Sequence, residues 1–261
     1  PRAVAKAIGF RFVPMKEKDM IRVAKEMGMS YTILQSRVNE LHEVNPMLGH
    51  RGCRLGISYP ELYLMQAEAI VRSALALKKM KGIDVSPEIM IPLVGMSGEL
   101  SLLKQQIEQH IEEIFKEEKM TLMYTLGTMI ELPRACLVAD ELVKDADFFS
   151  FGTNDLTQMT YGFSRDDAAK YINQYVAEGI LPVDPFQTID EEGVGELMRI
   201  AVKKSRQIKP KMKIGVCGEL GGDPTSIAFF DKIGLDYVSC SPFRVPVAYL
   251  AGAQSSIKQN N

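Results

Sequence analysis

Short apolar runs alternate along the chain with longer segments in which apolar residues recur every three or four positions. The short runs predict buried strands, and they lie at 88–94, 123–131, 148–152, 213–217 and 237–240. The longer segments predict helices, and they lie at 19–27, 31–40, 61–81, 99–118, 134–143, 193–208 and 225–233. Strands that alternate with helices in this way are typical of a parallel sheet covered by helices. The pattern therefore predicts an α/β fold.

Residues at the ends of these segments support the helix assignments. Ser30 is a good N-cap before the second helix, and Gly82 is a C-cap signal after the third. Asp223 and Pro224 suit the start of the last helix, within a 221–226 segment that lacks the ending of a nucleotide-binding Walker loop. The apolar face of the helix at 99–118 consists of Leu100, Leu103, Ile107, Ile111 and Ile114.

Two segments fit the alternation less clearly. Residues 51–55 form a possible sixth strand, and 161–190 is the longest stretch between a strand and its next clear helix. A long connection of this kind is often functional. At 261 residues the chain has the size of a (β/α) barrel, which commonly needs about 250. Eight strands would require two or three more, and the first 45 residues do not obviously supply them.

Composition narrows the class of protein. The chain is 46% hydrophobic and 25% charged, as in ordinary globular proteins, and its formal net charge of −2 gives no sign of nucleic-acid binding. No apolar stretch is long enough to predict a membrane span. The four cysteines form no C-x-x-C pair, which disfavours a zinc site or a secreted disulfide framework and favours the cytoplasm. The first residue is not Met, so we expect a piece of a longer product.

Polar residues follow several predicted strands at the point where each strand ends. In an α/β barrel the carboxyl ends of the strands carry the active site. The residues in these positions are Glu131, Asn154, Asp155, Cys217, Glu219, Ser241 and Arg244. Their repeated placement predicts a shared site at this edge of the sheet.

Glu131 and Asp155 follow two successive strands. Oxygen ligands with open positions suit Mg²⁺, but carboxylates also favour helix N-termini, and Glu131 directly precedes a helical segment. Residues 152–155, Gly-Thr-Asn-Asp, are open to two interpretations as well. Their backbone could approach an anion, or they could form a tight strand-to-helix turn.

Arginines and cysteines offer further candidates. Arg51, Arg54 and Arg165 could clamp a phosphate or carboxylate, although a surface ion pair is the commoner fate of an arginine. Cys217 closes the run I-G-V-C and could act as an acid, base or nucleophile, or be an inert buried thiol. Cys240 has a similar context, and the sequence barely separates the two.

Taken together, these motifs resemble the phosphoenolpyruvate (PEP)-binding barrel of the PEP-utilising enzymes. The similarity extends over residues 38–255, and C-G-E-L-G-G-D-P and G-H-R-G-C-R favour a dikinase branch over the sugar-transport Enzyme I and PEP synthase branches. The seven matching motifs, in order, are N-P-M-L-G-H-R-G-C-R, P-E-I-M-I-P-L-V, G-T-M-I-E-L-P-R-A, F-F-S-F-G-T-N-D-L-T-Q, G-F-S-R-D-D, C-G-E-L-G-G-D-P and Y-V-S-C-S-P-F-R-V-P.

The resemblance implies roles for individual residues. Glu131 and Asp155 match Mg²⁺ ligands, Cys217 matches the catalytic acid/base, and Arg165 matches an arginine at the substrate phosphate. The residues that match the surroundings of PEP or pyruvate are Arg51, Glu131, Gly152, Thr153, Asn154 and Asp155.

The resemblance also implies a reaction and partners. In the dikinase branch, ATP, pyruvate and phosphate give AMP, PEP and diphosphate, by way of a phosphohistidine on a separate domain. ATP binds a third domain, and the barrels pair as homodimers. We therefore expect the PEP/pyruvate half-site of such an enzyme, inactive on its own.

One family feature is not found. The family barrel opens with strands that carry two further PEP-binding arginines, one in a C-R-T-E-H-type motif, and no such motif occurs here. We therefore expect a (β/α)8 barrel of the TIM type that is incomplete at its N-terminus, with a helical segment at 1–37 and the barrel at 38–261. The alternatives are a non-catalytic truncated barrel or dimerisation module, a relative of the PEP synthase or Enzyme I type, and a pyruvate-class aldolase or lyase barrel.

Overall fold

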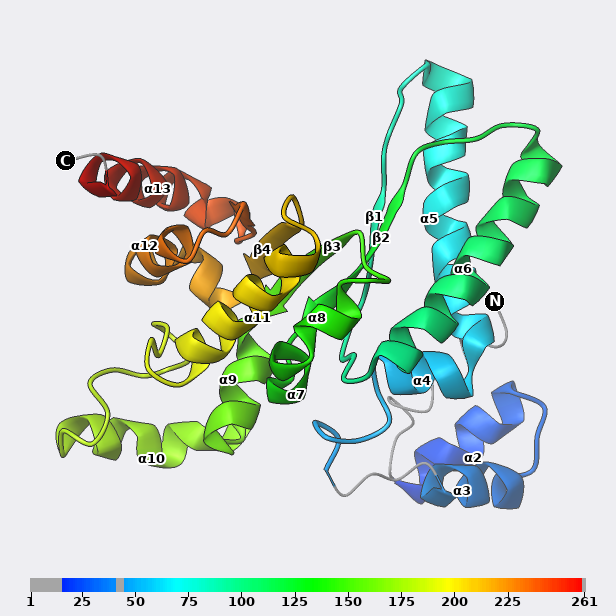
Figure 1. Cartoon of the computed structure of the whole chain (residues 1–261). Helices are drawn as coiled ribbons and strands as arrows, with labels where there is room; N and C mark the ends of the chain where they lie inside the picture. Colours follow the sequence, from blue (N-terminus) through cyan, green and yellow to red (C-terminus); the bar gives the residue numbers. More distant parts are fainter. Residues whose placement is uncertain (1–15, 41–44, 260–261) are drawn as a thin grey trace.

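The computed structural model describes residues 16–40 and 45–259, and the fold is an α/β arrangement around one parallel sheet (Figure 1). Within these described residues, five strands pair in the order in which they occur in the chain. They are β1 (Glu88–Ile91), β2 (Thr125–Ile130), β3 (Phe148–Gly152), β4 (Lys213–Cys217) and β5 (Tyr237–Val238). The predicted strands at 148–152 and 213–217 are confirmed to the residue, and the other three are shorter than predicted.

The register of the strands brings distant residues together at the carboxyl edge of the sheet. Ile130 pairs with Phe151, and Gly152 pairs with Cys217. Because Glu131 directly follows Ile130, the ends of β2, β3 and β4 place Glu131, Gly152 and Cys217 side by side. All five residues of β3 are buried, as expected for the centre of a sheet covered on both faces.

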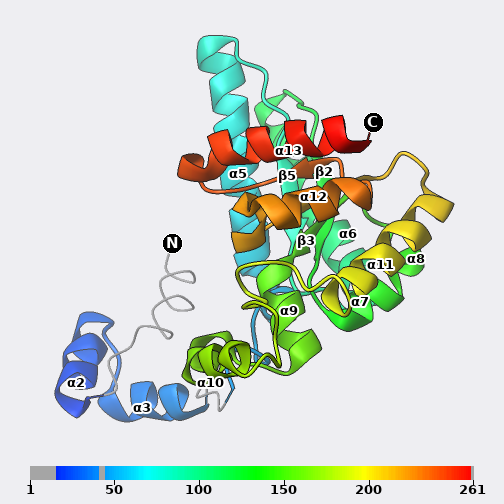
Figure 2. The same cartoon turned by 90° about the vertical axis from the view of Figure 1, so that its left-hand side faces the viewer.

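In the part of the chain that the structure describes, helices and two short 3-10 turns surround the sheet (Figures 1 and 2). After the N-terminal pair they are α4 (Cys53–Ser58), α5 (Pro60–Lys81), α6 (Ser97–Glu118), α7 (Pro133–Leu137), α8 (Ala139–Leu142), α9 (Thr153–Tyr161), α10 (Arg165–Ala177), α11 (Val194–Ile208), η1 (Glu219–Gly222), α12 (Pro224–Lys232), η2 (Pro242–Arg244) and α13 (Val245–Gln259).

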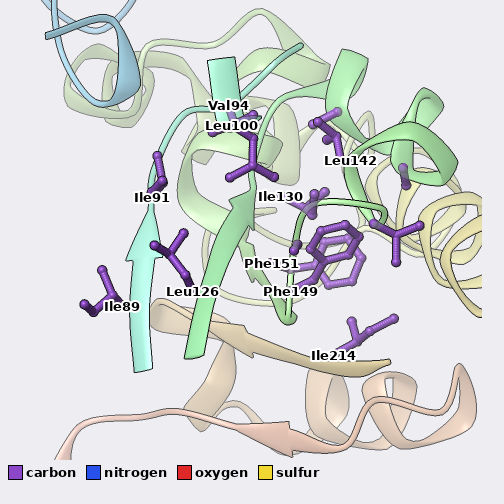
Figure 3. Close-up of a cluster of buried hydrophobic side chains, with 14 of the residues drawn as sticks. Ile89, Ile91, Val94, Leu100, Leu126, Ile130, Leu142, Phe149, Phe151 and Ile214 are labelled. Carbon is purple, nitrogen blue, oxygen red and sulfur yellow. The ribbon is translucent and has the colours of Figure 1, made fainter. Parts of the chain in front are cut away.

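The core lies between the sheet and these helices (Figure 3). Phe149 and Phe151 of β3 and Ile214 of β4 point into it, beside Leu142 of α8. The predicted apolar face of α6 is confirmed, since all five of its residues are buried. Gly82 ends α5 in the left-handed conformation, φ 64°, as the C-cap prediction required.

Helices α2 (Glu17–Glu26) and α3 (Tyr31–Glu40) pack on each other away from the sheet (Figure 2). Their small core consists of Met20, Ala24, Leu34 and Val38. The hydroxyl of Ser30 accepts a 3.3 Å hydrogen bond from the backbone of Ile33, which confirms the predicted N-cap. Residues 1–15 of the predicted 1–37 segment lie outside the described residues. The predicted domain boundary between residues 37 and 38 falls within α3, and the division into two domains stays a prediction.

Several expectations were wrong in detail. The possible strand at 51–55 is instead the start of α4, because Gly52 turns with φ 57° and the Cys53 amide donates to the Pro92 carbonyl. The helix predicted at 134–143 is interrupted at Val138, where φ is −113° and ψ 25°, and forms α7 and α8.

The connection at 161–190 contains the 13-residue helix α10, which had not been expected. Helix α13 was also missed. It packs along α12 at the C-terminal end of the chain (Figures 1 and 2). Within the described residues the strands form one five-stranded parallel sheet, with β1 and β5 at its two edges.

Candidate active site

Glu131 is a buried carboxylate at the end of β2, with 4% of its surface exposed. Its Oε1 accepts a 2.7 Å hydrogen bond from the backbone N–H of Leu93. Helix α7 is not capped by this side chain, since its N-cap position is Leu132 and no side-chain cap bond forms there. The capping interpretation of Glu131 is therefore wrong.

Leu93 is a residue that sequence reasoning did not single out. Its φ of 64° is rare for a residue with a side chain. Its N–H binds Glu131, and its carbonyl accepts a hydrogen bond from the Cys53 thiol at 3.1 Å. Strained backbone of this kind is often found at functional sites, but nothing in the letters P-L-V reveals it.

Gly152 leaves the space that Glu131 occupies. A Cβ on Gly152 would lie 2.6 Å from Glu131 Oε2 and 2.6 Å from Met129 Sδ. Real Cβ atoms do not approach other atoms so closely, so a larger residue here would displace the carboxylate. The glycine therefore serves the packing of the site itself.

Asp155 lies in the first turn of α9, which begins directly after β3. Its Oδ2 is 2.8 Å from Nη2 of Arg51, and no side-chain cap bond forms at this helix start. Its Oδ1 is buried and has no hydrogen-bond partner within the part of the chain that the structure describes. A buried oxygen without a partner is costly, which points to a ligand at this position.

The two carboxylates influence each other. The pKa of Glu131 is raised to about 7, chiefly by burial and then by the negative charge of Asp155, while the Leu93 amide and Arg51 act in the opposite direction. A second negative charge is therefore poorly tolerated here unless a cation joins the pair.

The donor set fits Mg²⁺, which prefers oxygen ligands and keeps part of its water shell. Glu131 and Asp155 offer carboxylate oxygens, and Asp155 Oδ1 has no other partner. Among the described residues, no group of three or more His, Cys, Asp or Glu side chains could hold a metal unaided. A divalent cation would therefore need water or substrate oxygens as further ligands.

Cys217 is a half-buried thiol in the same row of strand ends. Its Sγ lies 3.6 Å from the Phe151 carbonyl, and burial raises its pKa. The thiol is therefore protonated at neutral pH and can donate a proton. Thr153 donates to the Cys217 carbonyl at 3.3 Å, which joins the start of α9 to the end of β4.

Gly218 follows Cys217 with φ 104°. A Cβ there would lie 2.8 Å from Thr153 Oγ1 and 3.6 Å from Asn154 Oδ1. Asn154 is thus placed beside the β4 end, with Thr153 and Cys217. The structure brings together the predicted residues Arg51, Glu131, Gly152, Thr153, Asn154, Asp155 and Cys217.

The other two arginines lie differently. Arg54 donates to the carbonyls of Leu48 and Gly49 and so braces its own loop. Arg165 begins α10, and its Nη2 lies 3.6 Å from Oε1 of Glu219. The ion pair with Glu219 was not foreseen, although both residues had been noted separately.

The fold and the paired carboxylates thus define an α/β domain with a candidate site for a cation and an anionic ligand. The family described as PEP-utilising enzyme, PEP-binding domain, matches residues 2–257. The chain belongs to this family, as the motifs had indicated.

Curated relatives agree. The chain is 52% identical over 246 residues to pyruvate, phosphate dikinase of Clostridium symbiosum. The aligned region covers 94% of this chain and 28% of that protein. It is 54% identical over 245 residues to chloroplastic pyruvate, phosphate dikinase 1 of Arabidopsis thaliana, and the aligned region covers 93% of this chain and 25% of that protein. It is 55% identical over 238 residues to pyruvate, phosphate dikinase 2 of Zea mays, and the aligned region covers 91% of this chain and 27% of that protein. The chain thus spans about a quarter of the length of these relatives.

Proposed function

We propose that this chain is the Mg²⁺-dependent, PEP- and pyruvate-binding part of a pyruvate phosphate dikinase. The observation that carries the proposal is the pairing of Glu131 with Asp155, whose buried Oδ1 has no partner within the described residues. The similarity to three curated dikinases supports it. The whole reaction would convert ATP, pyruvate and phosphate to AMP, PEP and diphosphate.

PEP carries a carboxylate and a phosphate, and loss of the phosphoryl group leaves a negatively charged enolate oxygen. Glu131 and Asp155 would hold Mg²⁺ near this oxygen. When bound, Mg²⁺ supplies positive charge that stabilises the oxygen as a Lewis acid. Glu131 loses its proton to take up this role, since only the carboxylate is a ligand.

The remaining residues would orient the substrate and move one proton. Arg51 holds Asp155 in place and has donors left over for an anionic substrate group. The start of α9, with Thr153 and Asn154, offers backbone N–H groups of a helix N-terminus. The Cys217 thiol would give its proton to the methylene carbon, which yields pyruvate and a thiolate that solvent reprotonates. The reverse direction would use the thiolate as base.

We further propose the setting of the domain. Strands from another part of the protein would complete the sheet to a (β/α)8 barrel, with β1 and β5 as the edges that they join. A phosphohistidine-bearing segment and an ATP-binding segment would be the partners, and the domain would pair as a homodimer. Free cysteines favour a reducing compartment, and we propose the cytoplasm. Within the described residues no helix combines the length and apolarity that a bilayer crossing requires.

Calorimetry with Mg²⁺ and oxalate, a mimic of the enolate, tests this function. The unaltered chain should bind oxalate only when Mg²⁺ is present. Asp155→Asn and Glu131→Gln should each weaken this binding roughly tenfold or more, since each removes one charged ligand. Asp166→Asn, in the first turn of α10, is the matched control and should bind normally. Unchanged binding in both site variants, with normal circular dichroism, would refute the metal assignment.

A further inference from the structure

Cys53 is a fully buried residue at the start of α4, and it binds the segment that follows β1. Its backbone N–H donates a hydrogen bond of 3.0 Å to the Pro92 carbonyl. Its thiol donates to the next carbonyl along the chain, that of Leu93, at 3.1 Å. A single residue therefore holds two successive carbonyls, and the proposed function uses neither contact.

The peptide group between Pro92 and Leu93 connects Cys53 to Glu131. Its carbonyl accepts from the Cys53 N–H, and its own N–H donates to Glu131 Oε1 at 2.7 Å. Hydrogen bonds arranged head to tail in this way polarise and strengthen one another. The thiol binds the carbonyl on the other side of Leu93. The direction of the N–H that meets the carboxylate therefore depends on Cys53.

Leu93 has a backbone conformation that needs support from its surroundings. Its φ of 64° is unfavourable for a residue with a Cβ, and such conformations persist only where neighbouring groups hold them. The start of α4 lies directly against it, since a Cβ on Gly52 would lie 2.6 Å from Leu93 Cβ. The pKa of the Cys53 thiol is raised to about 12, chiefly by burial and then by the negative charge of Glu99, so the thiol keeps its proton and remains a donor.

We propose that Cys53 is a positioning residue for Glu131, and that its two hydrogen bonds hold Leu93 so that the N–H fixes the direction of the carboxylate. Arg51 lies two residues earlier on the same segment and binds Asp155 at 2.8 Å. This short segment thus sets both carboxylates of the candidate site. That the positioned carboxylate is a metal ligand rests on the proposed function, whereas the contacts that position it do not.

The alternative is that the Cys53 thiol only fills space in the core, as many buried cysteines do. Cys136 of α7 represents this alternative, because it is equally buried. Within the described residues its thiol donates no hydrogen bond to another residue. Alanine at Cys136 removes the same volume as alanine at Cys53 but no such bond, which makes it the matched control.

Cys53→Ala, Cys53→Ser and Cys136→Ala separate the hydrogen bond from the packing. The first readout is hydrogen exchange of the Leu93 amide in the metal-free chain, followed by NMR and normalised to the amides of β3, which report general loss of stability. In Cys53→Ala this exchange should be roughly threefold to tenfold faster, because the support of Leu93 is lost. Calorimetric binding of oxalate with Mg²⁺ should weaken by a similar factor. Cys53→Ser keeps a donor and should restore both quantities to within about twofold, and Cys136→Ala should change neither.

The unaltered chain provides a test that no folding defect can obscure, because its Leu93 amide should be protected from exchange. Exchange at the rate of an exposed amide would overturn the proposal. A Leu93 amide that is unaffected by Cys53→Ala would also overturn it. The same holds if Cys53→Ser behaves like Cys53→Ala, or if Cys136→Ala produces the same changes, since packing alone would then explain the effect.

Failure of the proposed function would look different. If even the unaltered chain does not bind oxalate with Mg²⁺, while the Leu93 amide responds as expected, the positioning of Glu131 by Cys53 stands and the metal assignment falls. If the unaltered chain and Cys53→Ala bind oxalate with Mg²⁺ equally tightly, the proposed function stands and the role of Cys53 falls.

Discussion

The guanidinium of Arg51 donates a hydrogen bond of 2.8 Å to Oδ2 of Asp155, across 104 positions of sequence. Exposure of the two side chains is only 23% and 16%. The bond uses one oxygen of Asp155 and leaves the buried Oδ1 without a partner in the described structure. Arg51 therefore orients the carboxylate as well as neutralising it.

Replacing Arg51 by glutamine should destabilise the ligand-free chain by about 1–3 kcal/mol, because Asp155 then keeps a largely buried charge without a counter-ion. Urea unfolding followed by circular dichroism measures this. Arg22→Gln removes the pair with Asp19, whose side chains are 66% and 40% exposed, and should change stability by less than about 1 kcal/mol. Equal effects of the two substitutions would contradict the structural role of Arg51.

Glu131 should make the metal-free chain less stable as the pH rises. Its pKa is about 7 in the folded chain and has the ordinary value of 4.5 when unfolded, so the folded state binds the extra proton between these pH values. The free energy of unfolding therefore falls as the pH rises through this window. At about 1.4 kcal/mol per pH unit, the full loss is on the order of 3 kcal/mol.

Urea unfolding at several pH values in the presence of a chelator tests the effect. Glu131→Gln should flatten the dependence between pH 5 and 7 relative to the unaltered chain, while the exposed Glu178→Gln in the turn after α10 should not. A slope that survives in Glu131→Gln would assign the titration to another group.

The elements with a strong pattern could be predicted from the sequence. The run F-F-S-F-G gave β3 to the residue, and the spacing of Leu100, Leu103 and Ile107 gave the buried face of α6. Helix α10 was missed because its 13 residues bury only Ala168 and Ile172, too few to produce a periodic signal. Residues 51–55, R-G-C-R-L, were wrongly assigned because a segment with only two apolar residues carries no periodic signal that separates a strand from a helix.

The membership of the candidate site was more predictable than its contacts. Carboxyl strand ends and family motifs together named Glu131, Asp155 and Arg51. No local pattern encodes the direction in which a side chain points, so the pairing of Arg51 with Asp155 could not be predicted, nor could the ion pair of Arg165 with Glu219. The strained backbone of Leu93 has no local sequence signal either. Strand register fixes which residues are neighbours, and packing then decides which atoms meet.

Alanine at Gly152 should damage the chain although it adds a single methyl group. The new Cβ would collide with Oε2 and Cβ of Glu131 and with Sδ of Met129. We expect destabilisation of about 1–3 kcal/mol and the loss of Mg²⁺-dependent oxalate binding. Gly98→Ala is the matched control: nothing lies within 4 Å of its new Cβ in α6, so it should be neutral or stabilising by up to about 1 kcal/mol. Thermal unfolding and calorimetry on both variants decide the point.

The thiols should differ in reactivity according to their burial. Burial raises the pKa of Cys53 and of Cys136 to about 12, and it raises that of the half-buried Cys217 as well. Alkylation requires the thiolate, so in the native chain at pH 8 Cys217 should react more slowly than an unperturbed thiol, while Cys53 and Cys136 should hardly react. The rate at Cys217 should rise with pH beyond about 9, the ordinary range of a cysteine.

Iodoacetamide labelling with peptide mass mapping measures each site, and labelling in urea, where the cysteines become equivalent, is the control. Rapid labelling of Cys217 near pH 6 would show a thiolate in the resting chain, and Cys217 could not then be the proton donor toward the methylene carbon.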